Sequence, residues 1–235
     1  MTLFVTIPTF TTIEKFIMED IKIIQKPDSV SWDDIHNLLM EAHQKNFKNG
    51  IVLRYAKMPG SEIEKTLGKE GRCWVAMDGD KLVGTTSVTF FKGKNWWNKG
   101  KKVAHGCFTG ILKSYQGIGI LEELFAKKYE YELECGTDMN EGDTAEGNKI
   151  VRKKFAKDGY KTVAFFASKS NHYSVRIVKW IGECPFTDKY INRRCKISEK
   201  LTKWQYKPGK IERSKIVSFL CRAANKIVKA YYGDK

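Results

Sequence analysis

A short glycine-bearing turn, set between an expected strand and an expected helix, is the feature that most constrains this chain. The segment ILKSYQGIGILEEL, residues 111–124, follows a β-rich run and passes straight into residues at helical spacing. Such a turn exposes successive backbone N–H groups at a helix N-terminus, and the helix dipole adds to them, so the turn suits a pyrophosphate. Gly117 and Gly119 let a ligand approach the backbone closely. A plain left-handed turn remains the alternative explanation.

The turn does not match the two commonest nucleotide-binding motifs, because no GK[ST] follows it and the chain has no GxGxxG. Apolar spacing and turn signals predict a strand, two helices, three strands, a helix, a strand or loop, a helix and two strands. A DG turn at residues 78–80 marks a hairpin. Ser31 is expected to cap the first helix, and Ser61 with Glu64 to form a capping box on the second. The expected strands are residues 16–26, 73–77, 82–91, 103–112, 160–167 and 173–180, and the expected helices begin near residues 32, 61, 120 and 144.

Two motifs resemble those of the GNAT acetyl-CoA-dependent acyltransferases. The fourth strand of that family leads into a [Q/R]xxGx[G/A] loop, which residues 115–120, YQGIGI, follow. Leu121 stands where the family has a small residue. Downstream, residues 148–160, NKIVRKKFAKDGY, match the pattern NxxAxxxYxxxGF at its Asn, at its Gly and at both aromatic positions. The resemblance spans roughly residues 16–180.

The resemblance implies a fold, a reaction and a set of cofactor contacts. The fold is α/β, a mixed and largely antiparallel sheet flanked by helices, and the reaction uses acetyl-CoA as co-substrate with no metal. In the family the pantetheine arm lies along the splayed fourth strand, the pyrophosphate lies on the loop amides, and the Asn side chain bonds the arm. Carried onto this chain, the cofactor residues are Ile111, Lys113, Gln116, Gly117, Ile118, Gly119, Ile120, Leu121, Asn148 and Phe155. Helix capping remains the alternative role of Asn148.

A base is the expected catalytic group, because an attacking amine must be neutral and must give up a proton. Relatives often supply a Glu from the fourth strand, but this strand, VAHGCFTGIL, has none. His105 is the candidate base, and a merely packed or exposed strand histidine is the alternative. Phe155 stands where the family often has a Tyr that protonates the leaving thiolate, so water or another group would be the acid. Cys107 lacks an evident third group for a nucleophilic Cys–His pair.

Three other patterns have local interpretations. The acidic stretch 130–146 lacks the ligand spacing of a calcium loop and is interpreted as a solvated helix end. His172 and Tyr173 are candidates for the border of the acceptor site, with a loop histidine as the alternative. The insertion KGKNWWNKGKK, residues 92–102, has the composition of a nucleic-acid contact, but no reader motif accompanies it. We therefore expect a loop that borders the acceptor pocket.

Positive charge is concentrated at the end of the chain. The formal net charge is +15, and residues 188–235 hold 14 Lys or Arg against 4 Asp or Glu, which is +10. This divides the chain into a GNAT-like domain, 1–187, and a basic C-terminal extension, 188–235, expected to be helical and packed on the domain or on a partner. Residues 214–232 have the pattern of a basic amphipathic helix. Docking on the core, docking on a second copy in a homodimer, and contact with an anionic membrane surface are its alternatives.

The sequence thus predicts an acetyltransferase that acts on an amine or hydroxyl of a small acceptor, with amino sugars and glycan precursors among the candidates. A catalytically silent CoA-binding, membrane-surface or interaction module on the same fold is the alternative, and nucleic acid is not an expected partner. No apolar run reaches the roughly 18 residues of a membrane span. Without a secretory pattern or paired cysteines, a cytoplasmic protein is expected, peripheral to the membrane if the tail binds one.

Overall fold

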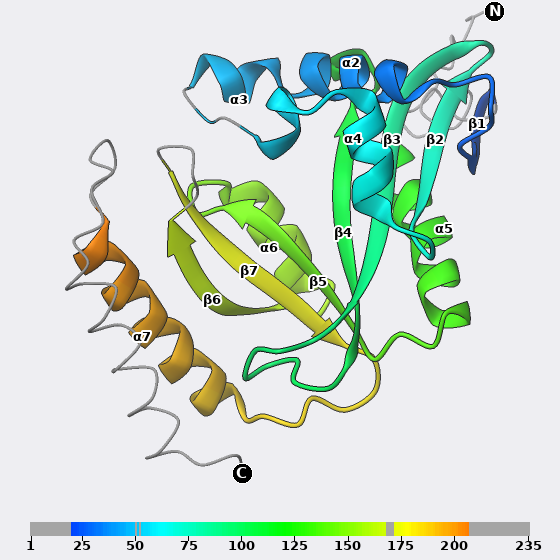
Figure 1. Ribbon diagram of the computed structural model, residues 1–235. Helices are drawn as coiled ribbons and strands as arrows, with labels where there is room; N and C mark the ends of the chain where they lie inside the picture. Colours follow the sequence, from blue (N-terminus) through cyan, green and yellow to red (C-terminus); the bar gives the residue numbers. More distant parts are fainter. Residues whose placement is uncertain (1–19, 50, 52, 168–171, 207–235) are drawn as a thin grey trace, which may run out of the picture. The chain divides into compact units, whose positions relative to one another are not determined.

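The computed structural model describes residues 20–49, 51, 53–167 and 172–206 (Figure 1). Its strands are β1 (Ile21–Gln25), β2 (Arg72–Asp78), β3 (Lys81–Lys92), β4 (Lys102–Ile111), β5 (Met139–Ala145), β6 (Lys161–Ala167) and β7 (Tyr173–Trp180), and they are hydrogen-bonded in the order β1-β2-β3-β4-β5-β7-β6. Strands β4 and β5 run parallel, whereas β1 with β2, β2 with β3, β3 with β4, and β6 with β7 are antiparallel. This confirms the expected mixed, largely antiparallel sheet with helices around it.

The chain divides into two compact units, residues 1–142 with 180–182, and residues 143–179 with 183–235. The first unit holds β1 (Ile21–Gln25), α2 (Trp32–Ala42), α3 (Gln44–Lys48), η1 (Arg54–Lys57), α4 (Gly60–Leu67), β2 (Arg72–Asp78), β3 (Lys81–Lys92), β4 (Lys102–Ile111), η2 (Lys113–Tyr115), α5 (Ile120–Glu134) and the first part of β5 (Met139–Ala145). The second holds the end of β5, α6 (Lys149–Lys157), β6 (Lys161–Ala167), most of β7 (Tyr173–Trp180) and α7 (Asp188–Gln205).

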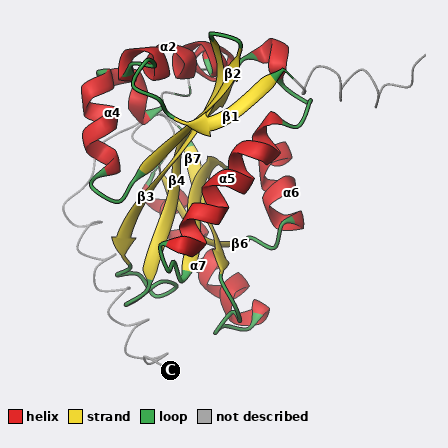
Figure 2. Ribbon diagram, turned by 90° about the vertical axis from the view of Figure 1, so that its right-hand side faces the viewer, coloured by secondary structure: helices red, strands yellow, loops and turns green. Residues whose placement is uncertain are grey.

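The core of the first unit lies on both faces of the sheet. Along β2, Cys73 and Val75 join a buried cluster with side chains of α2 and α4, whereas Trp74 and Ala76 join a second cluster with side chains of α5. This alternation is the period of two that a strand imposes. Figure 2 shows α4 and α5 on opposite sides of the strands. In β4, Phe108 joins the first cluster and Ala104 and Ile111 join the second, so α2 and α5 cover opposite faces of this strand as well.

Local turn and cap signals give the hairpin and the first helix as expected. Gly79 has φ 56° in the turn between β2 and β3. Ser31 forms a capping box on α2: its Oγ accepts from the Asp34 amide at 3.0 Å, and the Asp34 carboxylate accepts from the Ser31 amide at 2.8 Å. Both features depend on residues within three positions of each other, which is why the sequence shows them.

Two expected helix starts are wrong. Pro59, with no side-chain hydrogen bond, is the N-cap of α4, where a Ser61 capping box was expected. The Gly60 amide instead donates to Asp33 Oδ1 of α2 at 3.1 Å, so a neighbouring helix supplies the acceptor. The helix expected from residue 144 begins at Lys149, because residues 139–141 pair with β4 and the strand β5 continues to Ala145.

The second unit is built on the antiparallel pair of β6 and β7, against which α7 packs. Ser198 Oγ of α7 donates to the Phe165 carbonyl at 2.8 Å and accepts from the Phe165 amide at 3.0 Å. Thr202 Oγ1 donates to the same carbonyl at 2.9 Å. These hydroxyls satisfy backbone groups of β6, which lies at the edge of the sheet.

The first part of the basic extension is thus helical, as α7. The amphipathic pattern at residues 214–232 lies outside the described residues. Within the part of the chain that the structure describes, no helix is both long and apolar enough to cross a membrane.

Candidate active site

Strand β4 leaves its parallel partner halfway along its length. It pairs with β5 through three residue pairs only, the last of which is His105 with Glu141, although β4 continues to Ile111. Along residues 106–111, the edge of β4 that faced β5 has no strand partner in the described ranges. Its backbone groups there make no ladder with a described strand. The Thr109 and Ile111 carbonyls bond to the side chains of His43 and Gln116, and a ligand with amide groups could pair with the remaining groups as a strand would.

A bulge marks the start of this open stretch. The register with β3 passes from Ser87 opposite Cys107 to Thr85 opposite Gly110, so two residues of β4 face one of β3. Phe108, one of the two, has φ 48°, the only positive φ among the described non-glycine residues. A bulky residue in this region is strained by about 1 kcal/mol or more. Such strain is concentrated at sites that re-aim a strand.

His43 holds the bulged strand to the end of α2. Its Nε2 lies 2.8 Å from the Thr109 carbonyl, and its Nδ1 lies 3.0 Å from the Asn46 side-chain amide. A carbonyl can only accept, so Nε2 carries the proton and Nδ1 accepts from Asn46. Burial lowers the pKa of His43, against a smaller raising effect of the bond to Thr109, and this favours the same neutral form.

The glycine loop follows at the end of β4, as expected. Gly117 has φ 88°, and Gly119 has φ 96° as the N-cap of α5. Gly119 has no side chain to cap the helix, so the first-turn N–H groups of α5 are available to an acceptor. A Cβ on Gly117 would meet nothing within 4 Å, which shows open space in front of the loop. The loop therefore has the backbone geometry of an anion site.

Side chains on either side of the glycines fix the loop. Gln116 Nε2 donates to the Ile111 carbonyl at 2.9 Å, and the Tyr115 hydroxyl donates to Asp78 Oδ2 at 2.7 Å. The hydrogen bond to Asp78 is the main reason why the pKa of Tyr115 is raised. The first of these bonds brings together two residues of the expected cofactor site, and the second ties the loop to the β2–β3 hairpin.

The other loop residues expected to bind the cofactor differ in exposure. Ile120 is 1% exposed and its side chain packs in the core, so only its backbone amide is offered at the start of α5. Ile118 and Leu121 are partly buried against the same core. Lys113 is exposed on η2, and its carbonyl accepts from the Gln116 amide at 3.4 Å. Binding of a cofactor by these residues stays a prediction.

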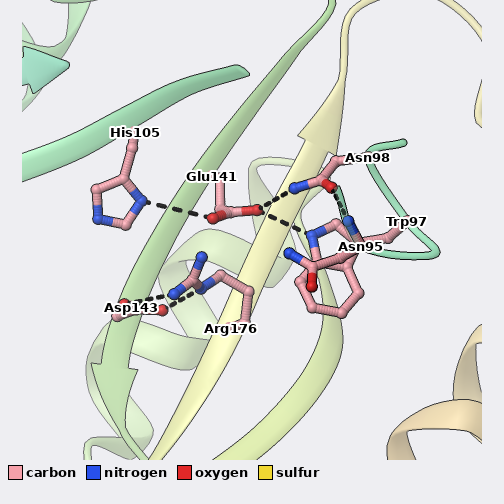
Figure 3. A network of polar contacts seen from close by, with 7 residues as sticks. All are labelled: Asn95, Trp97, Asn98, His105, Glu141, Asp143 and Arg176. Atoms are coloured by element: carbon pink, nitrogen blue, oxygen red, sulfur yellow. Dashed lines mark hydrogen bonds and ion pairs between the residues drawn. The ribbon is translucent and has the colours of Figure 1, made fainter. Parts of the chain in front are cut away.

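The expected base, His105, faces a buried carboxylate (Figure 3). Its Nδ1 lies 3.7 Å from Glu141 Oε1; the His105 side chain is 21% exposed and the Glu141 side chain 0%. Glu141 Oε2 accepts from Trp97 Nε1 at 2.8 Å and from Asn98 Nδ2 at 3.0 Å. The two strands and the loop after β3 thus meet at one carboxylate.

The loop of residues 93–101 is closed on itself and sends two side chains inward. Gly93 and Lys101 are joined by a backbone hydrogen bond of 2.8 Å, and a Cβ on Gly93 would lie 1.9 Å from the Asn98 carbonyl. Asn98 is fully buried, and its Oδ1 accepts from the Asn95 amide at 2.8 Å. Trp97 and Asn98 contact Glu141 of strand β5, whereas the lysines at 92, 94, 99 and 101 are exposed.

The interpretation of the acidic stretch 130–146 as a solvated helix end holds for Glu130 and Glu134, which are exposed at the end of α5, but is wrong for the residues after them. Residues 139–145 are strand β5, and Glu141 is 2% exposed. Only Met139 in this strand is a strong apolar residue, so no apolar pattern marks it. The signal that could have found Glu141 is the WWN run of residues 96–98, whose N–H donors require an acceptor when buried.

The downstream motif lies on α6 of the second unit. Asn148 is the N-cap of α6, and its Oδ1 accepts from the Val151 amide at 3.3 Å. Phe155 packs edge-on against Tyr160, with ring centroids 4.8 Å apart, in a cluster with β6 and β7. The capping role of Asn148 is thus present. Contacts of Asn148 or Phe155 with a cofactor stay predictions.

Two residues of β7, Tyr173 and Arg176, make further contacts within the second unit. The Tyr173 ring packs 5.2 Å from that of Phe165, and its hydroxyl donates to the Tyr206 carbonyl. Arg176 makes a two-point contact with Asp143 through Nε and Nη2. Burial lowers the pKa of Arg176 to about 10.

Among the described residues, no group of His, Cys, Asp and Glu is placed to hold a metal ion.

No protein-family model matches the sequence, and no curated protein matches it. Solved structures do match. An acetyltransferase from Streptococcus agalactiae has a TM-score of 0.54 at 15% identity, covering 69% of this chain and 99% of that one. A GCN5-related N-acetyltransferase from Kribbella flavida has a TM-score of 0.52 at 14% identity, with the same coverage.

A chain of the NatC complex bound to Gag peptide and CoA has a TM-score of 0.56 at 10% identity, again covering 69% of this chain and 99% of that one. The chain has the fold of the GNAT acetyltransferases, as its two sequence motifs predict.

Proposed function

We propose that this chain moves an acetyl group from acetyl-CoA directly to an amine or hydroxyl of a small acceptor. The observation that carries the proposal is the open edge of β4 from Gly106 to Ile111, which ends in the glycine loop. A backbone edge suits the amide-containing pantetheine arm, and the N–H groups at the start of α5 suit the pyrophosphate. Helix α5 begins at Ile120, nine positions after the end of β4 at Ile111.

The residues at the loop fit such a ligand. Gly117 faces open space, and Gly119 leaves the helix start uncapped. Leu121, the departure from the family pattern, keeps its amide, and its side chain is partly buried against the core. One compared structure, the NatC complex, was solved with CoA and a peptide, which supports CoA as the ligand here.

In the proposed reaction His105 accepts a proton. The acceptor nitrogen forms a bond to the acetyl carbon, the carbon–sulfur bond breaks, and the CoA thiolate leaves with the bonding electrons. His105 Nε2 takes the proton that the nitrogen loses, and the thiolate takes one from water, because Phe155 has none to give. Positioning of the thioester along β4 supplies much of the rate.

The test is acetyl transfer to spermidine, glucosamine and a peptide with a free N-terminus, followed by CoA release and by mass spectrometry of the product. We expect one class of acceptor to be acetylated. His105→Ala should lower the rate about 10²-fold or more. His36→Ala, on α2, is the matched control and should keep it. Failure of the wild type to acetylate any of these amines would favour the catalytically silent alternative.

A further inference from the structure

The Glu141 carboxylate is held in one orientation by two donors on the same oxygen. Oε2 accepts from Trp97 Nε1 at 2.8 Å and from Asn98 Nδ2 at 3.0 Å, and the side chain is wholly buried. A buried carboxylate needs such partners, since losing its hydration without them is strongly unfavourable. With Oε2 occupied by the loop, Oε1 is the oxygen turned toward His105 (Figure 3).

The donors cannot exchange their roles. Asn98 Oδ1 accepts from the Asn95 amide at 2.8 Å, so its Nδ2 is the group that faces Glu141. The indole nitrogen of Trp97 can only donate. Both loop groups therefore donate, and any atom that occupies the place of Oε2 must accept a hydrogen bond. This asymmetry between the two carboxylate oxygens is built by the loop of residues 93–101.

We propose that Glu141 is a positioning residue that fixes the tautomer of His105. Oε1 draws the proton of the neutral imidazole to Nδ1, so that Nε2 carries no proton, and the 93–101 loop maintains this through Trp97 and Asn98. The 3.7 Å separation between Nδ1 and Oε1 is longer than a hydrogen bond and shortens when His105 becomes an imidazolium. The catalytic part of the inference rests on the proposed function; the tautomer part does not.

An amide at position 141 provides a sharp test. In Glu141→Gln the amide oxygen must occupy the place of Oε2, because the two N–H donors of the loop face it. The amide NH₂ then points at His105 Nδ1, which must accept, and the imidazole proton moves to Nε2. Shape and volume barely change, while the nitrogen that should act as the base becomes protonated. A carboxylate-to-amide change beside a catalytic histidine acts in this way in serine proteases.

The experiment is long-range ¹H–¹⁵N NMR of the whole chain labelled with ¹⁵N-histidine at a pH where His105 is neutral. The chain has only four histidines, so His105→Gln assigns the signals. We expect an N–H-type Nδ1 and an unprotonated Nε2 in the wild type, and the reverse in Glu141→Gln. Glu132→Gln, another fully buried glutamate of the first unit, is the matched control and should leave the His105 signals unchanged.

The kinetic readout follows on the acceptor that the amine panel identifies. Glu141→Gln should lower kcat about 10²-fold with the KM for acetyl-CoA unchanged, and Glu132→Gln should leave kcat unchanged. A wild-type His105 protonated on Nε2 would overturn the proposal even if Glu141→Gln does not fold. The same tautomer in wild type and Glu141→Gln would also overturn it. Because the NMR result needs no acetyl-CoA, a tautomer exchange in a chain without activity would reject only the proposed function.

Discussion

Two glutamates of the first unit, Glu132 and Glu141, are both wholly buried but are held in different ways. Glu132 Oε1 accepts from Lys128 Nζ at 2.6 Å, one turn earlier on α5, and its Oε2 has no hydrogen bond among the described residues. Glu141 contacts β4 through His105 and the 93–101 loop through Trp97 and Asn98. The first is a charge pair inside one helix, and the second joins three separate segments.

The difference separates a stabilising contact from a chemical one. Lys128 and Glu132 neutralise each other under the sheet, where a Cβ on Gly106 would lie 3.8 Å from Lys128 Nζ, and neither reaches open space. Glu141 has one oxygen committed to the loop and the other turned to a histidine that is 21% exposed. A buried carboxylate therefore indicates function here only when part of its hydrogen-bonding capacity is directed at an accessible group.

The largest expected effect on stability comes from breaking the Lys128–Glu132 ion pair within α5. Glu132→Ala leaves the ammonium of Lys128 buried without its carboxylate, and the free energy of unfolding should fall by about 3–5 kcal/mol. The measurement is urea denaturation. Glu130→Ala, which removes the exposed pair with Lys127, is the control and should cost less than about 1 kcal/mol. A loss below that value in Glu132→Ala would contradict the assignment of a buried pair.

The second prediction concerns the loop donors at Glu141. Glu141→Ala leaves the N–H groups of Trp97 and Asn98 without their acceptor and should cost about 2–4 kcal/mol of unfolding free energy. Glu141→Gln keeps an acceptor at that place, so it should cost about 1 kcal/mol. Denaturation of both variants measures the difference. Equal losses would show that the two donors do not hold the carboxylate.

The third prediction is a pH dependence of stability that originates in Glu132. Burial is the main cause that raises the pKa of Glu132 above its ordinary value of 4.5, against the lowering effect of Lys128. As pH rises past 4.5 the unfolded carboxyl ionises before the folded one, so the unfolded state binds fewer protons and stability falls. The fall ends once the folded carboxyl ionises. Denaturation across this range should show a fall in wild type that is absent in Glu132→Gln.

The smallest loss of stability is expected when a single N–H donor to Glu141 is removed. Trp97→Phe removes one N–H bond to Glu141 and should cost about 1 kcal/mol. Trp96→Phe is the matched control, since the same change next door leaves both Glu141 bonds in place. Thermal or urea unfolding of the two variants gives the comparison. A larger loss in Trp96→Phe would show that packing of the tandem indoles, rather than the bond to Glu141, dominates.

Features that depend on neighbours in sequence could be predicted, and those that depend on distant partners could not. The glycine loop, the Ser31 cap and the DG hairpin are each set by a few adjacent residues, and all three are present. The cap of α4 comes from Asp33, and the burial of Glu141 comes from Trp97 and Asn98, more than 40 residues away. The sequence of strand β5 has no alternation of apolar residues. Its buried Glu141 is held by hydrogen bonds from polar partners, which apolar periodicity cannot reveal.

The most direct test of the account is calorimetric titration with acetyl-CoA of three proteins: the wild type, Gly117→Trp and Gly136→Trp. Both glycines have positive φ, and a Cβ on either would meet nothing within 4 Å, but Gly117 precedes α5 and Gly136 follows it. Both substitutions therefore place a tryptophan at a positive φ, at opposite ends of one helix. We predict micromolar binding to the wild type and to Gly136→Trp and none to Gly117→Trp. No binding to the wild type, or equal binding to all three, would contradict the placement of acetyl-CoA on the glycine loop.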